Sequence, residues 1–217
     1  MIFQKHAILA ILLAFFALFT AQTARALDFT TVVIDAGHGG YDRGGIPGQY
    51  VPEKTVALDV AKRVQILLKQ KGLRTVMTRS GDYFVPLSSR VAIANSQSRA
   101  IFVSVHFNSA EREGAMGFET YYYGSAGAPL AARILRNLMT TCSTENRGVK
   151  QRGFYVLRNT RIPAVLIECG FLTNSTEARR SLSAPHRQKL AEAIAEGVLA
   201  QKYSGPMGSG GYMRTSD

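Results

Sequence analysis

The sequence predicts a single α/β domain built on a mostly parallel, mixed sheet with helices on both faces. Three observations carry this prediction. Short runs rich in Val and Ile alternate with amphipathic stretches, no internal repeat is present, and no linker separates a second domain. Parallel strands that are buried on both faces appear as continuous apolar runs and are joined by helices. The 217 residues, 46% hydrophobic and 19% charged, suit one globular domain rather than a disordered chain.

The first half of the chain alternates strand and helix. Residues 29–36 (FTTVVIDA) are apolar and β-branched, which indicates a strand. Residues 53–71 carry valines on one helical stripe and end before Gly72, which is placed to stop a helix. The next predicted elements are a short strand at 73–79, a helix at 87–98 and an apolar strand at 100–107.

The second half continues the alternation. Residues 117–123 (GFETYYY) alternate in polarity and predict a strand at one side of the sheet. A helix that starts near Ala128 is indicated by apolar residues at helical spacing, namely Leu130, Ile134, Leu135 and Leu138. The remaining predicted elements are strands at 154–158 and 163–169 (PAVLIEC) and a final helix at 186–203.

Both ends of the chain differ from the domain between them. Residues 1–26 have a basic start, a polar-free run over 7–19 and a terminal Ala-Arg-Ala, which is typical of a cleaved secretory signal peptide. The apolar run is shorter than the roughly 20 residues of a membrane span, although an uncleaved anchor is the alternative. The predicted organisation is a signal peptide at 1–26, a folded domain at 27–203 and a disordered Gly/Ser-rich tail at 204–217.

The net charge is +11, and removal of residues 1–26, which contain Lys5 and Arg25 but no acidic residue, reduces it to +9. We expect the mature chain to act in the periplasm or outside the cell, without stable insertion in a membrane. That location disfavours nucleic acid and favours an anionic envelope polymer or a lipid surface as the partner. The two cysteines, Cys142 and Cys169, could pair or remain buried thiols, because sequence does not place their Cα atoms.

Four polar residues are candidates for chemistry. His38 follows the first predicted strand, His106 and Glu168 lie near the ends of two others, and Glu53 opens the first long helix. In an open α/β sheet, ligands bind beyond the carboxyl ends of the strands, so these side chains are expected at one edge. Two His and one Glu form a common ligand set for catalytic zinc, and a further carboxylate can act as general base.

Each of these residues also has a structural interpretation. His38 could be a turn histidine bonded to backbone, and His106 could cap a strand end. Glu53 could interact only with the helix dipole. Glu168 follows Val-Leu-Ile in an apolar strand, where a carboxylate needs a salt-bridge partner or a metal to offset its desolvation. The dispersed spacing of the four residues does not decide between these readings.

Six stretches, taken in order, resemble the zinc-dependent N-acetylmuramoyl-L-alanine amidases of the amidase_3 family. They cover almost all of the predicted domain: DAGHGGYDRGG (35–45), PEKTVALDVAKRV (52–64), TRSGDYFVPLSSR (78–90), AIFVSVHFNS (100–109), GFETYYY (117–123) and PAVLIECGFLTN (163–174). The resemblance implies one zinc ion held by His38, Glu53 and His106. It also implies Glu168 as the catalytic residue and Asn108 as a substrate contact. Arg79 and Arg90 match the family pattern too, with a structural role as the alternative.

The resemblance further implies hydrolysis of the amide between N-acetylmuramic acid and L-alanine in peptidoglycan, in cell-wall remodelling, daughter-cell separation or recycling. Two alternatives remain: another zinc peptidoglycan hydrolase, such as a carboxypeptidase or deacetylase, and a non-catalytic wall-binding module. Some regulated relatives carry an extra helix that blocks the zinc site. Only four residues separate Tyr123 from the helix near Ala128, so we expect an open site that needs no activator. We also expect a monomer.

Overall fold

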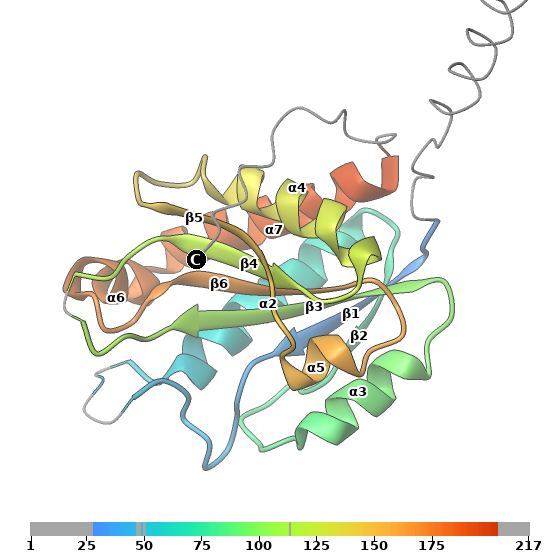
Figure 1. The fold of residues 1–217 in the computed structure, drawn as a ribbon, viewed down its shortest axis with the longest axis horizontal. Coiled ribbons are helices and arrows are strands. Elements are labelled where there is room, and N and C mark those ends of the chain that lie inside the picture. The colour runs from blue at the N-terminus through green and yellow to red at the C-terminus, as the bar shows by residue number, and fades with distance from the viewer. Residues whose placement is uncertain (1–27, 47–48, 50, 113, 204–217) are drawn as a thin grey trace, which may run out of the picture.

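The computed structural model describes residues 28–46, 49, 51–112 and 114–203 (Figure 1). The signal peptide predicted at 1–26 and the tail predicted at 204–217 lie outside the described residues. The strands are β1 (Thr31–Ala36), β2 (Arg74–Met77), β3 (Ala100–Asn108), β4 (Phe118–Tyr122), β5 (Asn146–Gln151) and β6 (Ala164–Phe171). The helices are α2 (Glu53–Gln70), α3 (Leu87–Asn95), α4 (Ala128–Leu138), α5 (Tyr155–Arg158), α6 (Ser175–Leu182) and α7 (Ala184–Tyr203).

The strands form one mixed sheet in the order β2-β1-β3-β6-β4-β5. The first four strands of this order run parallel to one another, β4 is antiparallel to β6, and β5 is parallel to β4. The predicted mostly parallel, mixed α/β sheet is therefore confirmed. As a result, the carboxyl ends of β1, β3 and β6 lie at the same edge, where ligands bind in open α/β sheets.

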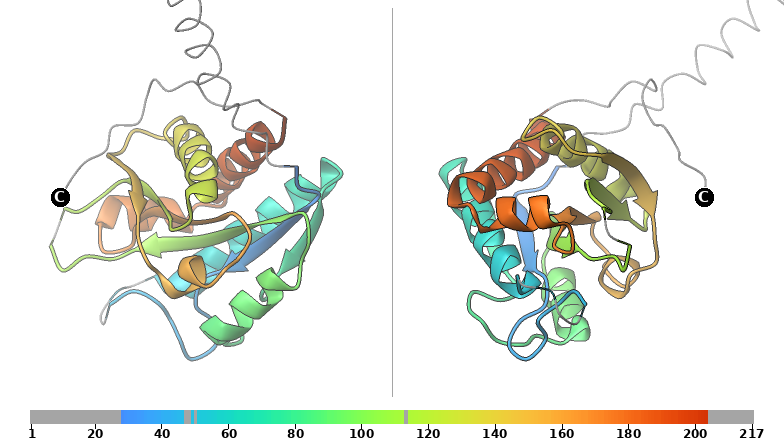
Figure 2. Two further views of the ribbon diagram at one scale, coloured as in Figure 1. Left: turned by 45° about the vertical axis from the view of Figure 1, so that its right-hand side comes forward. Right: turned by 90° about the vertical axis from the view of Figure 1, so that its left-hand side faces the viewer.

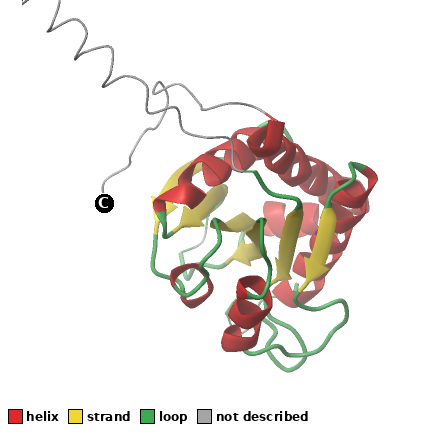
Figure 3. Ribbon diagram, turned by 90° about the vertical axis from the view of Figure 1, so that its right-hand side faces the viewer, coloured by secondary structure: helices red, strands yellow, loops and turns green. Residues whose placement is uncertain are grey.

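Helices cover both faces of the sheet, as the sequence predicted (Figures 1 and 2). On one face, α2, α4 and α7 pack over the larger apolar core, which includes Val60, Ile134 and Val198. On the other face, α3 and α5 cover a smaller cluster around Phe102 and Leu166. Figure 3 shows the strands enclosed between these two helical layers. Two buried faces require apolar residues at successive strand positions, which explains the continuous apolar runs of β1, β3 and β6.

The strand predicted at residues 154–158 is wrong, because the chain forms the one-turn helix α5 there. The backbone N–H groups of Leu157 and Arg158 donate to the carbonyl of Phe154 at 3.0 and 2.9 Å. Val156 and Leu157 are buried, whereas Tyr155 and Arg158 are exposed. Burial of two consecutive residues fits a helical turn, since side chains of a strand alternate between its faces.

Two elements, β5 and α6, were not predicted. The β5 segment NRGVKQ is polar and contains a glycine, so its sequence lacks the apolar pattern of a strand. It pairs on one side only, at the edge of the sheet, where charged side chains are common. Its presence also corrects the placement of residues 117–123, because β4 lies one strand in from the edge. The α6 helix carries only two buried residues and begins at Asn174, whose side chain accepts from the backbone of Thr176 and Glu177.

Neither cysteine forms a disulfide: Cys142 is half-buried and Cys169 is buried. This outcome matches the free-thiol alternative. The described residues contain no helix with both the length and the apolar character that crossing a membrane requires.

Candidate active site

The loop after β1 places His38 in an unusual backbone conformation. Its φ of 58° lies in the left-handed region, which costs free energy for a residue other than glycine. A residue stays in this region when the surrounding structure compensates for that cost. The compensation here comes from one side chain just after β2 and one in α3, which hold the loop backbone.

Two buried arginines hold this loop. Arg79 is 1% exposed and donates from Nη2 to the carbonyl of Gly37 at 2.6 Å. Arg90 is 2% exposed, donates to the carbonyl of His38 at 2.7 Å and pairs with Asp35 at 2.8 Å. A guanidinium presents five donors in a fixed fork and can therefore hold several carbonyls at once. These contacts give Arg79 and Arg90 the structural role that the sequence left as an alternative.

Two glycines leave the space in which the candidate ligands meet. A Cβ at Gly37 would lie 2.4 Å from the His106 ring, and a Cβ at Gly44 would lie 2.5 Å from the Glu53 carboxylate. Gly44 also has a φ of 67°, which L side chains rarely adopt. Gly37 and Gly44 are thus explained by the close approach of the candidate ligand side chains.

Glu53 begins α2 directly after Pro52 and is 3% exposed. Its two carboxylate oxygens lie 2.8 Å from His106 Nδ1 and 3.0 Å from His38 Nε2. The backbone N–H of Phe107 also donates to Oε1 at 3.1 Å. Burial alone would raise the pKa of Glu53, but its hydrogen bonds to the two histidines outweigh burial and lower the pKa to about 2. Glu53 is therefore an anion at neutral pH.

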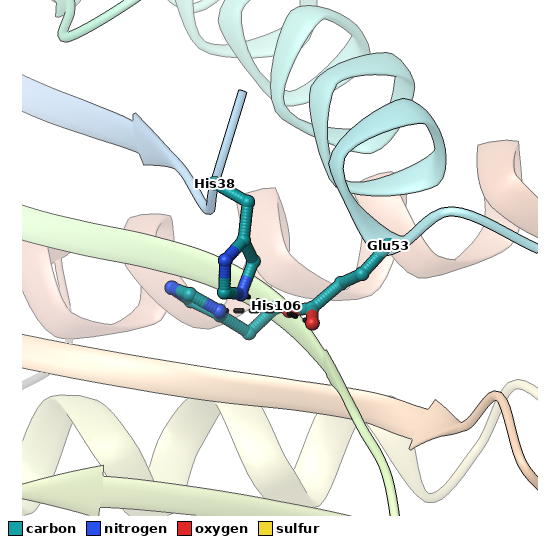
Figure 4. A group of neighbouring side chains, drawn as sticks. All are labelled: His38, Glu53 and His106. Carbon is teal, nitrogen blue, oxygen red and sulfur yellow. Dashed lines mark hydrogen bonds and ion pairs between the residues drawn. The ribbon is translucent and has the colours of Figure 1, made fainter. Parts of the chain in front are cut away.

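His38, Glu53 and His106 come from three elements and converge on one point (Figure 4). Each offers one ligand atom, and these atoms all lie within 4.8 Å of one another. Two imidazole nitrogens facing one buried carboxylate form a donor set suited to a transition-metal ion such as zinc. The other nitrogen of His38, Nδ1, lies 2.9 Å from Asp42 Oδ2. A carboxylate behind a ligand histidine is the usual device that orients the ring, and the sequence did not identify Asp42. His38, Glu53 and His106 therefore form a group that could hold a metal ion.

Glu168 lies in β6 beside His106 of β3, because the two are register partners in the parallel pair. Its Oε2 atom is buried and has no hydrogen-bond partner among the described residues. Burial raises the pKa of Glu168 well above its usual value, and the charges of Glu53 and Glu119 raise it further. Among the described residues, no cationic side chain pairs with the Glu168 carboxylate. The salt-bridge interpretation of Glu168 is therefore not supported. The register shift just beyond His106 indicates a bulge beside these two residues.

Asn108, at the end of β3, has both ends of its amide engaged. Its Nδ2 donates to Glu119 Oε1 at 2.5 Å, and its Oδ1 accepts from the N–H of Ser109 at 2.7 Å. Glu119 is 2% exposed and also accepts from Tyr121 at 2.6 Å and from Lys150 at 2.6 Å. The sequence did not single out Glu119, which stands between Phe118 and the polar Thr120 without a local pattern that marks it.

A cavity of about 780 Å³ opens beside His38. Tyr41, Asp42, Ile46 and Gln49 line it together with His38. The candidate metal group therefore lies next to a space large enough for part of a polymer substrate.

Comparison with known proteins identifies the family of this chain. The N-acetylmuramoyl-L-alanine amidase family Amidase_3 matches residues 32–200. LytC of Bacillus subtilis, an N-acetylmuramoyl-L-alanine amidase, is 39% identical over 78% of this chain, which spans 35% of the length of LytC. AmiA of Escherichia coli, also such an amidase, is 31% identical over 78% of this chain and 75% of its own.

Solved structures of amidases have a similar fold. The catalytic domain of the amidase CwlV from Paenibacillus polymyxa has a TM-score of 0.74 and 37% identity, over 78% of this chain and 96% of that domain. CwlD of Clostridioides difficile, solved in complex with the GerS lipoprotein, has a TM-score of 0.75 and 29% identity, over 79% and 98%. The chain belongs to Amidase_3, the family of N-acetylmuramoyl-L-alanine amidases, which hydrolyse an amide bond of peptidoglycan.

Proposed function

We propose that this chain is a zinc-dependent amidase that cleaves the bond between the lactyl group of N-acetylmuramic acid and L-alanine. His38, Glu53 and His106 hold one zinc ion, and Glu168 is the catalytic residue. The observation that carries the proposal is the unpartnered Oε2 of Glu168 beside a convergent His-Glu-His group. A buried carboxylate without a partner is costly, and such a cost is typical of a functional site.

Zinc at this site supplies Lewis-acid activation of water and of a carbonyl. The residues of the chain supply the remaining functions. Glu168 accepts the proton of the attacking water at Oε2 and returns it to the amine of the departing L-alanine. Burial and the charges of Glu53 and Glu119 raise the pKa of Glu168, which favours uptake of the proton from water. Asp42 holds the His38 ring in its orientation.

Asn108 remains a proposed substrate contact. An amide side chain has two N–H groups and two acceptor lone pairs. Glu119 and Ser109 each use one of these, so the geometry leaves one donor and one acceptor for a substrate at the end of β3.

Product analysis tests the reaction against the two alternatives. Purified protein comprising residues 27–203 is incubated with peptidoglycan, and the new chain ends are identified. The amidase produces a free L-alanine amino terminus and a free lactyl carboxylate. Loss of a terminal D-amino acid would indicate a carboxypeptidase, loss of acetate a deacetylase, and binding without new ends a wall-binding module. Activity that survives exhaustive chelation would refute the zinc proposal.

We also propose that residues 1–26 direct secretion to the cell envelope, that 27–203 form the catalytic domain and that 204–217 form a tail. The mature protein acts as a monomer without an activator. The short connection between β4 and α4, which contains one turn of 3-10 helix at Ser125–Gly127, supports an open site. The same assay tests whether an activator is needed. A pure monomer that hydrolyses peptidoglycan only after a second protein is added would contradict the proposal.

A further inference from the structure

An exposed aromatic pair lies on the loops beside the metal group. Tyr41 and Phe84 stack with their ring centroids 4.5 Å apart and their planes inclined by 28°. Tyr41 is 80% exposed and Phe84 is 36% exposed. Two adjacent aromatic rings that face solvent form an apolar surface, and such surfaces in soluble proteins often mark binding sites.

The two loops that carry this pair are joined by hydrogen bonds. Gly40 donates from its backbone N–H to Asp82 Oδ1 at 2.8 Å. Lys54 Nζ donates to the carbonyl of Gly40 and to Asp82 Oδ2, both at 2.7 Å. A Cβ at Gly40 would lie 2.7 Å from the backbone nitrogen of Phe84, so the loops are also in close contact. The aromatic pair is thus held in place before any ligand arrives, which lowers the entropy cost of binding.

The position of the pair relates it to the substrate. Tyr41 lines the same cavity as His38. The sheet order places β1 and β2, whose loops carry the pair, on one side of His106, and Glu168 and Glu119 on the other. A polymer that crosses this edge of the sheet at the metal group would extend toward Tyr41 in one direction and toward β4 and β5 in the other.

The chemistry of each side indicates which part of the polymer it takes. The β5 side is basic, because Arg147 and Lys150 lie beside Glu119 at this edge of the sheet, and cationic side chains suit the carboxylates of a stem peptide. The Tyr41 side has aromatic faces and the carboxylate of Asp42, which suit an uncharged ring with apolar C–H groups. We propose that Tyr41 and Phe84 form a subsite for an N-acetyl sugar ring of the glycan chain. This inference rests on the proposed function and adds the direction in which the substrate lies.

Binding of peptide-free glycan chains tests the subsite without relying on catalysis. We expect Tyr41→Ala to weaken binding of these chains about tenfold, equivalent to about 1.4 kcal/mol, because it removes one of the two stacked aromatic rings. Phe84→Ala acts in the same direction, and Tyr41→Phe retains binding. Tyr203→Ala is the matched control: Tyr203 is 68% exposed, and its neighbour Lys202 contacts the carbonyl of Phe29 at the opposite edge of the sheet.

A second ligand and a kinetic measurement complete the test. Binding of free stem peptide is unchanged in Tyr41→Ala, whereas KM on uncrosslinked peptidoglycan rises with little change in kcat. The inference is overturned if wild-type protein does not bind peptide-free glycan, if Tyr41→Ala binds it as tightly, or if stem-peptide binding falls equally. Tyr41-dependent binding to anionic phospholipid vesicles instead of glycan would assign the pair to a membrane surface. Failure of the proposed function is distinct, because it appears as an absence of new L-alanine termini with wild-type protein.

Discussion

The loop that carries His38 and the strand that carries Glu168 differ in how their polar atoms are satisfied. Around His38, Arg79 and Arg90 donate to successive backbone carbonyls, and the His38 ring contacts both Asp42 and Glu53. Glu168, one strand beyond His106, keeps a buried oxygen without a partner among the described residues. The difference fits the proposed roles, in which the residues that hold an ion are fixed by many contacts and the carboxylate that transfers a proton keeps an oxygen without a partner.

The largest expected effect comes from the free carboxylate. Glu168→Gln removes the proton acceptor and preserves the volume of the side chain. We expect kcat to fall by about 10²–10⁴-fold, the usual contribution of general acid–base catalysis. Metal content stays at the wild-type level, because Glu168 is not among the three convergent ligands.

Metal analysis and thermal unfolding of the same Glu168→Gln sample complete this prediction. Unfolding occurs at or above the wild-type temperature, since the substitution replaces a buried, unpaired acid by a neutral amide. Loss of the metal together with activity would instead assign Glu168 to the ligand set.

The second-largest expected effect concerns the buried contacts that hold the His38 loop. Arg90→Ala leaves Asp35, which is 1% exposed, without its cation and frees the carbonyl of His38. Breaking a buried ion pair in this way costs about 3–5 kcal/mol of unfolding free energy, measured by denaturant titration. Arg99→Ala is the control, because the Arg99–Asp28 pair is exposed and contributes about 1 kcal/mol or less. Equal losses in the two variants would contradict the assigned role of Arg90.

The pH dependence of stability provides a second test of the Arg90–Asp35 ion pair. Burial raises the pKa of Asp35, but the charge of Arg90 and hydrogen bonds from Ser104 and Thr78 outweigh burial and lower it. A carboxyl with a lowered folded pKa stabilises the protein above its unfolded pKa of 3.8, and this stability is lost as pH falls through the folded value. Unfolding free energy between pH 6 and pH 3 should therefore fall less steeply in Arg90→Ala than in the wild type.

The smallest expected effect compares two glycines with similar backbone. Gly44 and Gly72 have φ values of 67° and 78°, but only Gly44 has side chains where a Cβ would lie. Both alanine variants incur backbone strain of roughly 1–2 kcal/mol. Gly44→Ala should in addition lower metal affinity at least about tenfold, by displacing Glu53 and His38, whereas Gly72→Ala should not. Metal affinity is measured by competition with a chelator. Equal affinity in the two variants would contradict the inference that Gly44 leaves space for the Glu53 and His38 side chains.

The two halves of the sheet were not equally predictable. The strands β1, β3 and β6 are buried on both faces, so their runs of Val, Ile and Phe were visible in the sequence. The edge strand β5 is polar because one side and one face meet solvent, and it was missed. Residues 154–158 are apolar as well, but periodicity over five residues does not separate a strand from one turn of helix. Burial on both faces therefore made the central strands visible. The polar sequence of β5, rather than its edge position, concealed it, since β2 at the other edge was predicted.

The same contrast applies to the site. The residues His38, Glu53, His106 and Glu168 were singled out from their places at strand and helix ends, and the structure brings one ligand atom of each of the first three within 4.8 Å of the others. Asp42 and Glu119 were not singled out, because Asp42 lies in a polar, glycine-rich loop and Glu119 is next to the polar Thr120, so neither stands out from its neighbours as Glu168 does. Their importance follows from contacts with His38, Asn108 and Lys150.

By itself, the sequence determined the fold class, the central strands and the identity of the residues that could perform chemistry, because periodicity and residue type are local properties. Tertiary structure alone decided which oxygen of Glu168 stays unpartnered, how two arginines hold the His38 loop, and where Tyr41 meets Phe84. Each of these depends on groups far apart in the chain, such as Arg90 and His38, which lie 52 positions apart. Their approach depends on packing of the whole sheet and its helices, which no local pattern records.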